Sequence, residues 1–222
     1  MRYMCGRFVL CTTDEQLLQV PGFAAVHAPM GLPAPRYNIA PTQKIAVLRA
    51  GSTPHEGVIE PARWGLLPSW KQDDSGPPLF NARAETVTEK PSFRAAFASR
   101  RCLIPLDGYY EWHNKQPYWI TTGSVVWVAG LWDSGAQQLS ATMITTDSRP
   151  PLDRVHHRMP RFLSEDEFTM WLQGSPDQAA SLLIPGDASA FSLTPADKAV
   201  GNIRNDYPEL IGLNVDKLPI DE

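Results

Sequence analysis

The sequence predicts a single α+β domain in which strands dominate and short helices lie between them. The chain has 222 residues, 43% of them hydrophobic, which is enough for one substantial core. Its 21 prolines and 15 glycines favour many short elements joined by turns. Short apolar runs outnumber segments with helical periodicity, and no repeat or interdomain linker interrupts them. We therefore expect residues 1–222 to form one domain.

In the first half of the chain, strands are separated by one short helix. The expected elements are a strand at 5–11, a helix opened by capping-box residues at 12–16, and strands at 44–49 and 58–67. Pro21 and Gly22 end the helix. The turn at 51–54 makes the last two strands a hairpin with a long loop. Residues 28–35 and 71–78 are expected to be loops.

The second half mixes strands and helices. The expected elements are a helix at 92–99, strands at 102–105, 118–122, 125–132 and 139–145, a helix after a capping box at 164–167, and a helix at 177–183. Phe93 and Phe97 give the first helix its apolar face. The last three strands are expected to form a meander, with 125–128 central because it is apolar on both faces. Residues 200–205 lack periodicity and are expected to tie back to the core.

Composition excludes several classes of protein. No run approaches the roughly 18 apolar residues of a membrane span, and no signal peptide is visible, so we expect a protein of the bacterial cytosol. The three cysteines, Cys5, Cys11 and Cys102, show no CxxC spacing, which argues against a disulfide framework or a zinc ribbon. The net charge is −4, so any nucleic-acid contact must use a local basic face.

The start of the chain holds a candidate nucleophile. Translation from Met4, or removal of residues 1–4, would make Cys5 the N-terminal residue. An α-amine has a pKa of about 7.7–8.0, so near neutral pH part of it can condense with an aldehyde to an imine. The neighbouring thiol can then close a five-membered thiazolidine. The alternative is a buried strand cysteine, because free cysteine is among the most buried residue types.

Aldehyde capture also needs proton transfer and a hydrogen-bond partner for the substrate oxygen. Glu111 stands among aromatic residues and is the carboxylate candidate, with a raised pKa expected; the alternative is an exposed strand glutamate. His156 is the histidine candidate; the alternative is that it and His157 belong to a solvated basic loop. Two histidines without a third ligand do not make a metal site. Asn38 and Asn81 are amide candidates, although their turn-like settings also favour asparagine.

Arginines recur beside these candidates, at positions 7, 36, 83, 154 and 158. Arginines next to exposed aromatic rings suit single-stranded nucleic acid, because cations bind phosphates while bases stack on the rings. Most of the seven tryptophans must belong to the core. Trp70 is the candidate for exposure because it adjoins the polar loop that begins at Lys71.

Eight blocks of sequence, taken together and in order, resemble the SRAP family of abasic-site processing proteins. The blocks are MCGRF (4–8), RYNIAP (36–41), WGLLPSW (64–70), NARAET (81–86), RCLIP (101–105), GYYEW (108–112), HHRMP (156–160) and AVGN (199–202). Each block alone is weak evidence. In this order and at compatible spacing they are highly specific, and the resemblance spans nearly the whole chain, from residue 4 to about residue 205.

The resemblance implies a β-rich, antiparallel, barrel-like core with peripheral helices and a narrow positive groove for single-stranded DNA. It also implies covalent capture of an abasic site: the aldehyde of the opened sugar condenses with the Cys5 amine, and the thiol closes a stable thiazolidine. By the family pattern Asn81 holds the sugar, while Glu111 and His156 handle protons. An AP lyase activity would be compatible with the same imine chemistry.

The same resemblance implies which residues bind DNA. They are Arg7, Asn38, Trp70, Arg83 and Arg158, with Asn38 and Arg83 lining the pocket and Trp70 packing against displaced bases. The expected partner is single-stranded DNA that contains abasic sites, in the response to DNA damage, with nucleoid association when bound. We expect a monomer that uses no cofactor and no metal and does not bind membranes.

The sequence departs from the family pattern at three places. Residues 1–3 precede Met4, so Cys5 is not terminal as written, and an acylated nitrogen cannot form the imine. Lys71 follows Trp70 where some members carry a second tryptophan, which weakens the expected stacking. Pro91 follows Lys90 where a basic residue is common, which puts one phosphate contact in doubt.

Two other functions compete with DNA crosslinking. The first is a thiol peptidase or autopeptidase with Cys5 as nucleophile and His156 as base. The second is a non-catalytic single-strand binding module that uses Trp70 and the arginines. A peptidase would turn over peptides, and a binding module would be insensitive to Cys5→Ala, whereas the crosslinking reaction would give a stable protein–DNA adduct.

Overall fold

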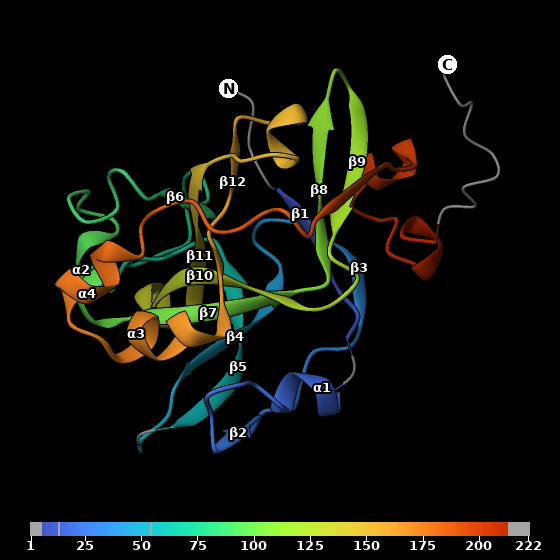
Figure 1. Ribbon diagram of the computed structural model, residues 1–222. Coiled ribbons are helices and arrows are strands. Elements are labelled where there is room, and N and C mark those ends of the chain that lie inside the picture. The colour runs from blue at the N-terminus through green and yellow to red at the C-terminus, as the bar shows by residue number, and fades with distance from the viewer. Residues whose placement is uncertain (1–5, 13, 54, 213–222) are drawn as a thin grey trace.

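The structure is a computed structural model that describes residues 6–12, 14–53 and 55–212 (Figure 1). Cys5 and residues 1–4 lie outside the described residues. The first strands are β1 (Arg7–Leu10), β2 (Ala25–His27), β3 (Arg36–Ile39), β4 (Lys44–Ala50), β5 (Glu56–Trp64), β6 (Asn81–Arg83) and β7 (Arg101–Leu106). The later strands are β8 (Gly108–His113), β9 (Gln116–Thr121), β10 (Val126–Asp133), β11 (Ser140–Asp147), β12 (Arg158–Pro160), β13 (Phe162–Leu163) and β14 (Ser192–Pro195). The α-helices are α1 (Asp14–Leu18), α2 (Arg94–Ser99), α3 (Phe168–Gln173) and α4 (Pro176–Ser181).

The helices begin where the sequence places their caps. Before α3, the Ser164 backbone N–H donates to Glu167 Oε2 at 2.9 Å in the predicted capping box. α4 has proline at its first position, and Ser175 and Gln178 exchange hydrogen bonds of 3.2 and 2.8 Å. The strand-rich α+β class is therefore confirmed, with short helices at the periphery.

A five-stranded antiparallel sheet holds the start of the chain. Its order is β14-β9-β8-β1-β3. β1 lies between β8 and β3, with Arg7 opposite Tyr110 and Phe8 opposite Ile39. The N-terminal strand is thus an interior strand, which fixes the backbone of Arg7 and its neighbours on both sides.

A larger sheet follows the order β12-β11-β10-β7-β4-β5-β2, with β13 on β10 and β6 on β11. A parallel contact between β5 and β11 joins the two arms of this path into a ring, through Arg63 opposite Ser140 and Trp64 opposite Ala141. The ring is not a regular barrel. Most strand pairs are antiparallel, as expected, and the pairs β2–β5, β5–β11 and β6–β11 are parallel.

The expected meander of three strands is wrong for its first strand, predicted at 118–122, which is β9 in the structure. β9 pairs with β8 and β14, whereas β10 pairs with β7, β11 and β13. The short link at 122–125 therefore carries the chain from one sheet to the other. A short polar turn looks the same in sequence whether it joins neighbouring strands or crosses between sheets. The central position predicted for 125–128 is confirmed for β10.

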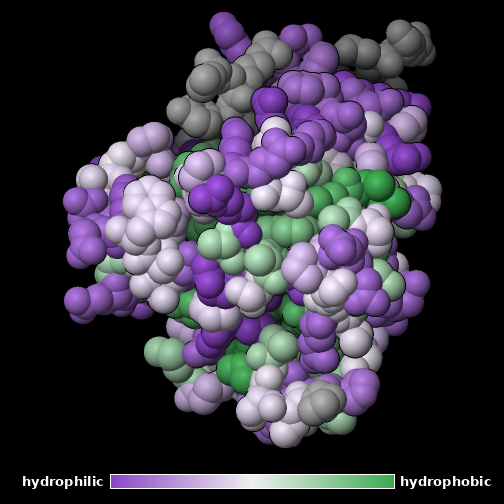
Figure 2. All heavy atoms as spheres, turned by 90° about the vertical axis from the view of Figure 1, so that its left-hand side faces the viewer, coloured by the Kyte–Doolittle hydropathy of each residue, from purple (hydrophilic) through white to green (hydrophobic). Residues whose placement is uncertain are grey.

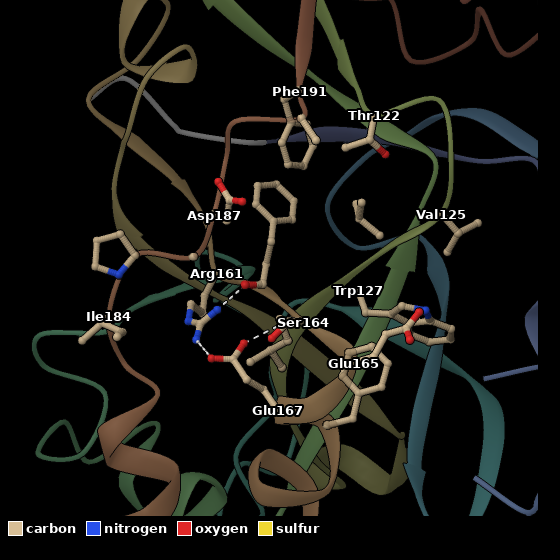
Figure 3. A pocket seen from close by; sticks show the side chains of 17 residues that line it. Thr122, Val125, Trp127, Arg161, Ser164, Glu165, Glu167, Ile184, Asp187 and Phe191 are labelled. Atoms are coloured by element: carbon tan, nitrogen blue, oxygen red, sulfur yellow. Dashed lines mark hydrogen bonds and ion pairs between the residues drawn. The ribbon is translucent and has the colours of Figure 1, made fainter. Parts of the chain in front are cut away.

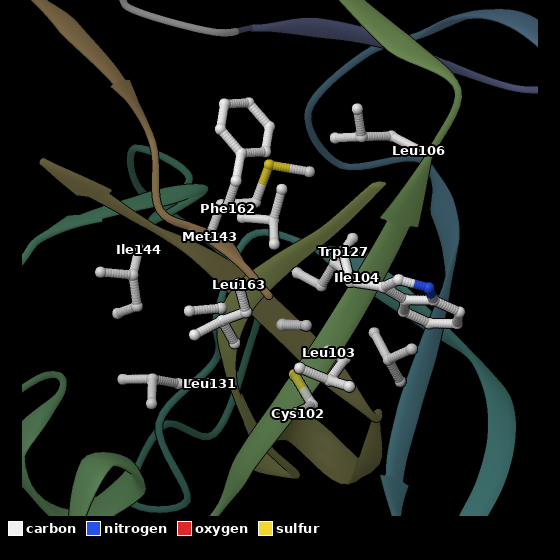
Figure 4. Packing of buried hydrophobic residues seen from close by; sticks show 14 of the residues in the cluster. Cys102, Leu103, Ile104, Leu106, Trp127, Leu131, Met143, Ile144, Phe162 and Leu163 are labelled. Carbon is white, nitrogen blue, oxygen red and sulfur yellow. The ribbon is translucent and has the colours of Figure 1, made fainter. Parts of the chain in front are cut away.

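The core lies between the large sheet and its helices. Figure 4 shows buried side chains of β7, β10, β11 and β13 packed together, Cys102 among them. α2, α3 and α4 lie on one side of the large sheet (Figure 1), where Trp171 donates from Nε1 to the Cys102 carbonyl at 2.9 Å. Trp64 packs edge-on against Phe8 with ring centroids 5.0 Å apart and so joins the core to the N-terminal strand.

Candidate functional site

A cavity of about 420 Å³ opens beside the N-terminal strand. Its described lining residues are Gly6, Arg7, Pro41, Pro78, Phe80 and Trp112. Three of them adjoin predicted catalytic residues in the sequence: Gly6 is bonded to Cys5, Phe80 to Asn81, and Trp112 to Glu111. The fold therefore brings three distant segments, each next to a candidate catalytic residue, to one opening.

Glu111 lies on β8, the strand paired with β1. Its side chain is only 4% exposed, so the alternative of a solvent-exposed strand glutamate is wrong. Its carboxylate oxygen Oε1 accepts a hydrogen bond of 3.0 Å from the Trp112 backbone N–H. Because Tyr110 is opposite Arg7, the next residue along β8 is beside the point where the chain enters β1.

His156 lies in the loop before β12, and that loop contacts the end of β8. His113 Nδ1 is 3.3 Å from the Val155 carbonyl oxygen, which brings the loop to the strand that carries Glu111. His156 is 9% exposed, so the prediction of a solvated loop is wrong for this side chain. The His157 ring packs against it at a centroid distance of 4.4 Å.

The backbone around His156 determines its tautomer. The Arg158 backbone N–H donates to His156 Nδ1 at 3.1 Å. Nδ1 also lies 3.4 Å from the Arg158 carbonyl oxygen, which is the longer of the two contacts. A backbone N–H cannot accept a hydrogen bond, so the shorter contact favours a lone pair on Nδ1. The proton of the neutral ring is therefore on Nε2, which makes that nitrogen a donor.

β6 presents two predicted site residues on one face. Asn81 and Arg83 are two positions apart, so their side chains point the same way, while Ala82 between them is buried. β6 pairs with β11, where Asn81 is opposite Met143 and Arg83 opposite Thr145. Arg83 is exposed and forms no ion pair with a described residue, which leaves its guanidinium available to solvent anions.

Arg7 and Asn38 both bind the C-terminal segment at 200–205. Arg7 Nη1 donates to the Val200 carbonyl at 2.7 Å and to Asn38 Oδ1 at 3.1 Å. Asn38 Nδ2 lies within hydrogen-bond distance of three carbonyl oxygens, those of Val200 and Asn202 at 3.1 Å and that of Asn205 at 2.7 Å. The expectation that this segment ties back to the core is confirmed.

Arg7 is a cation without a carboxylate partner among the described residues. Among those residues its hydrogen-bond partners are two backbone carbonyls and one amide oxygen. Burial lowers the pKa of its guanidinium, but arginine stays charged in proteins. Because Arg7 also lines the cavity, it contributes positive charge there.

Arg158 is held in a network of oxygen acceptors. Its guanidinium forms a bidentate pair with Glu85 at 2.5 and 2.9 Å and contacts Asp147 and the Thr145 carbonyl, each at 2.6 Å. Burial acts to lower the pKa of Arg158, but the hydrogen bonds that it donates to the carboxylates of Glu85 and Asp147 outweigh burial and raise the pKa. The side chain is 7% exposed, so it supports the His156 loop from below the surface.

Trp70 is 65% exposed, which confirms the prediction that it is a surface tryptophan, while Trp64 is fully buried. Trp70 does not line the cavity. It lies on the loop that leaves the sheet after Leu66 and returns at Leu79, and Pro78 near the end of this loop does line the cavity.

The structure adds residues that sequence reasoning did not assign. Glu85 and Asp147 hold Arg158, and backbone carbonyls at 200–205 hold Arg7 and Asn38. Glu85 stands inside the block NARAET at 81–86, which was the available signal for it, but backbone carbonyls leave no signal in a sequence. Among the described residues, no cluster of three or more potential ligands could hold a metal ion. Within the same residues, no helix has the length and apolar character needed to cross a membrane.

Comparisons with known proteins agree with one another. The family model of SRAP, described as SOS response associated peptidase, matches residues 4–203. The abasic site processing protein YoaM of Bacillus subtilis is 36% identical over 225 aligned residues, which cover 94% of this chain and 97% of that protein. The abasic site processing protein YedK of Escherichia coli is 30% identical, with 94% and 99% covered. The abasic site processing protein HMCES of Pongo abelii is 32% identical, with 94% and 75% covered.

Solved structures show the same fold. A crystal structure of a protein from Bordetella bronchiseptica superposes with a TM-score of 0.73 at 25% identity and covers 87% of this chain and 100% of that one. A second, from Bacteroides thetaiotaomicron, has the same TM-score and identity and covers 88% and 93%.

Proposed function

Because the chain belongs to the SRAP family, we propose that it processes abasic sites in single-stranded DNA by forming a covalent thiazolidine crosslink through Cys5. The observation that supports this proposal best is the cavity beside β1. Its lining includes the residue bonded to Cys5 and the neighbours of Asn81 and Glu111. The three segments that carry the candidate amine, amide and carboxyl group therefore meet at this cavity, and these are the groups that aldehyde capture requires.

The proposed reaction needs no reagent beyond the protein and the lesion. The α-amine of Cys5 adds to the aldehyde carbon of the opened sugar and gives a carbinolamine. Loss of water from the carbinolamine gives an imine. The thiol sulfur then adds to the imine carbon, and the thiol proton passes to the nitrogen as the ring closes. One water is released in total, and no oxidant or reductant is used.

Each side chain has a role that follows from its environment. Glu111 is buried beside the entry of the chain into β1, and it would protonate the hydroxyl that leaves the carbinolamine, a contribution of about 10²–10⁴-fold in rate. His156, with its proton on Nε2, would donate to the sugar oxygen during ring opening. Asn81 would hold the sugar through its amide.

Single-stranded DNA would be bound by cations and an aromatic ring around the cavity. Arg83 is exposed, and neither Arg83 nor Arg7 pairs with a carboxylate in the part of the chain that the structure describes, so both suit phosphate groups. Trp70 offers an exposed face for base stacking. Asn38 and Arg158 are occupied by protein partners, and we propose that they act through Arg7 and His156 rather than by touching DNA.

The test is adduct formation between the protein and a single-stranded oligonucleotide with one abasic site, analysed on a denaturing gel after heating. Protein that begins at Cys5 should give a heat-stable adduct, and protein that retains residues 1–4 should not. Cys5→Ala should lose the stable adduct but keep an imine that borohydride traps, because it retains the amine. Cys11→Ala is the matched control and should crosslink normally. If Cys5→Ala gave a heat-stable adduct without borohydride, the Cys5 sulfur would not be needed to close a thiazolidine ring, and the proposed reaction would be wrong.

A second candidate, a peptidase, is favoured by the description of the family as SOS response associated peptidases. Cys5 would then attack a peptide carbonyl. Incubation with peptides separates the two functions, because a peptidase releases product repeatedly while crosslinking consumes one protein per lesion. A non-catalytic single-strand binding module would give a different result. Neither the unaltered protein nor Cys5→Ala would form an adduct, and Cys5→Ala would bind single-stranded DNA as tightly as the unaltered protein.

A further inference from the structure

A second cavity, of about 490 Å³, shares no described lining residue with the cavity of the candidate site (Figure 3). Aromatic rings contribute much of its wall: Trp127 from β10, Phe162 from β13, Phe168 from α3 and Phe191 next to β14. Ile184 lies at its edge and is 57% exposed, one of the few large apolar side chains open to solvent among the described residues. The proposed DNA chemistry makes no use of this apolar opening.

The charges around this second cavity are predominantly negative. Glu165, Glu167 and Asp187 belong to its lining. Arg161 is its only cation among the described residues, and its side chain is 2% exposed. Arg161 donates to the Leu182 carbonyl at 2.7 Å and to Glu167 at 2.5 Å, a pair that Figure 3 shows beside Ser164. Arg161 therefore offsets Glu167, and the carboxylates of Glu165 and Asp187 remain to attract a cation.

A third cavity, of about 420 Å³, adjoins the second and makes the opening elongated. The two share Val125, Trp127 and Glu165 in their linings. The third cavity is polar, with Thr12, Gln16, Gln19 and Asp107 among its residues. Asp107 is occupied by the backbone N–H groups of Cys11 and Thr12 at 2.6 and 2.9 Å. An occupant that filled both cavities would be a chain several residues long with an apolar part at one end.

We propose that these adjoining cavities, the acidic groove, dock a basic amphipathic segment of a partner protein. Its large apolar side chain would enter the aromatic cavity, and Lys or Arg residues beside it would approach Glu165 and Asp187. The sign of the charge argues against nucleic acid, because phosphates would meet carboxylates without a free cation among the described residues. Ile184, which follows α4 and is exposed, would extend the apolar contact. Figure 2 shows hydrophobic surface between hydrophilic side chains on the side of the molecule that carries α4 in Figure 1.

The experiment uses two acetylated peptide amides as probes, the basic peptide KKLFKK and its acidic counterpart EELFEE. Each is titrated into isotope-labelled full-length protein up to a ~100-fold excess, about 2 mM peptide. Backbone amide shifts in nuclear magnetic resonance spectra report where each peptide binds. KKLFKK is expected to shift amides of the acidic groove, including Val125 and Ser164, and EELFEE is expected to shift none of them. Absence of saturable shifts with KKLFKK, shifts of equal size with EELFEE, or shifts confined to the cavity beside β1 would overturn the proposal.

Charge-reversed variants supply the second measurement. Glu165→Lys combined with Asp187→Lys should weaken KKLFKK binding about tenfold, because each reversal replaces an attraction between opposite charges by a repulsion. Glu89→Lys combined with Glu209→Lys makes the same charge change at exposed positions outside the groove and should alter binding less than twofold. Equal weakening by both pairs would mean that only the net charge matters and would refute a site. Abasic-DNA crosslinking should be unchanged in either double variant, so failure here is distinguishable from failure of the proposed function.

Discussion

Replacing Asn38 by alanine tests whether this residue holds the C-terminal segment or contacts DNA. Asn38 is fully buried, and its amide nitrogen lies within hydrogen-bond distance of three backbone carbonyl oxygens between Val200 and Asn205. Its amide oxygen accepts from Arg7. No isolated part of the chain could reproduce this contact, because 162 residues separate Asn38 from Val200.

The magnitude follows from the bonds that alanine cannot make. A hydrogen bond contributes about 0.5–1.5 kcal/mol net, and an orphaned buried group costs about 1–3 kcal/mol. The Val200 carbonyl keeps Arg7 as a donor at 2.7 Å, and the carbonyls of Asn202 and Asn205 are near enough to the surface to be hydrated. We therefore expect Asn38→Ala to lower the free energy of unfolding by about 2–4 kcal/mol.

Urea unfolding followed by tryptophan fluorescence measures the change, and salt-dependent affinity for single-stranded DNA is measured beside it. Asn205→Ala is the matched control, because the Asn205 side-chain amide donates to the Ala199 carbonyl at 2.7 Å and has no other hydrogen-bond partner among the described residues. It should cost about 1 kcal/mol. A loss below about 0.5 kcal/mol for Asn38→Ala, together with weakened DNA binding, would refute the structural role and return Asn38 to the DNA contacts.

Three further outcomes are expected. Iodoacetamide at pH 7.5 should modify Cys5 but spare Cys11, because burial and a neighbouring carboxylate raise the pKa of Cys11 to about 11 and only the thiolate reacts; peptide mass mapping that finds equal labelling of both would contradict this. Burial acts to raise the pKa of Glu85, but its bonds to Arg158 outweigh that and lower it from 4.5, so its stabilisation is present above that pH and is lost as pH falls through the folded value. Glu85→Gln should therefore destabilise the protein at pH 7 and have little effect in strong acid, and equal effects in thermal melts at both pH values would argue against the ion pair. Arg83→Ala should reduce the slope of log affinity against log salt by about 0.7 on single-stranded DNA, and an unchanged slope would remove Arg83 from the phosphate contacts.

Local elements of this fold can be predicted from the sequence because their causes are local. The capping boxes before α3 and α4 are side chains that satisfy N–H groups three residues away. The hairpin of β4 and β5 follows from a turn between two apolar runs, and its register pairs Lys44 with Arg63. Phe93 and Phe97 are both buried, as their helical spacing predicts.

The candidate site could be predicted only in part, because motifs identify residues but not their surroundings. The blocks of the sequence picked out Glu111 and His156, and the structure buries both, Glu111 on the strand paired with β1 and His156 in a loop that contacts the end of β8. The same blocks assigned Arg158 to DNA. In the structure its guanidinium has four oxygen contacts, with Glu85, Asp147 and the Thr145 carbonyl.

The sequence by itself determined the short helices and several of the strands, such as β4, β10 and β11, and its motifs nominated the residues of the proposed reaction. The tertiary structure alone decided that β9 and β10 belong to different sheets, that β5 meets β11, and that the segment at 200–205 lies against Arg7. These contacts join residues that are far apart in the chain; Arg7 and Val200 are 193 positions apart. Local propensity and periodicity act over one element, whereas such a pairing is selected by burial of the whole core and by satisfaction of every buried hydrogen-bonding group at once.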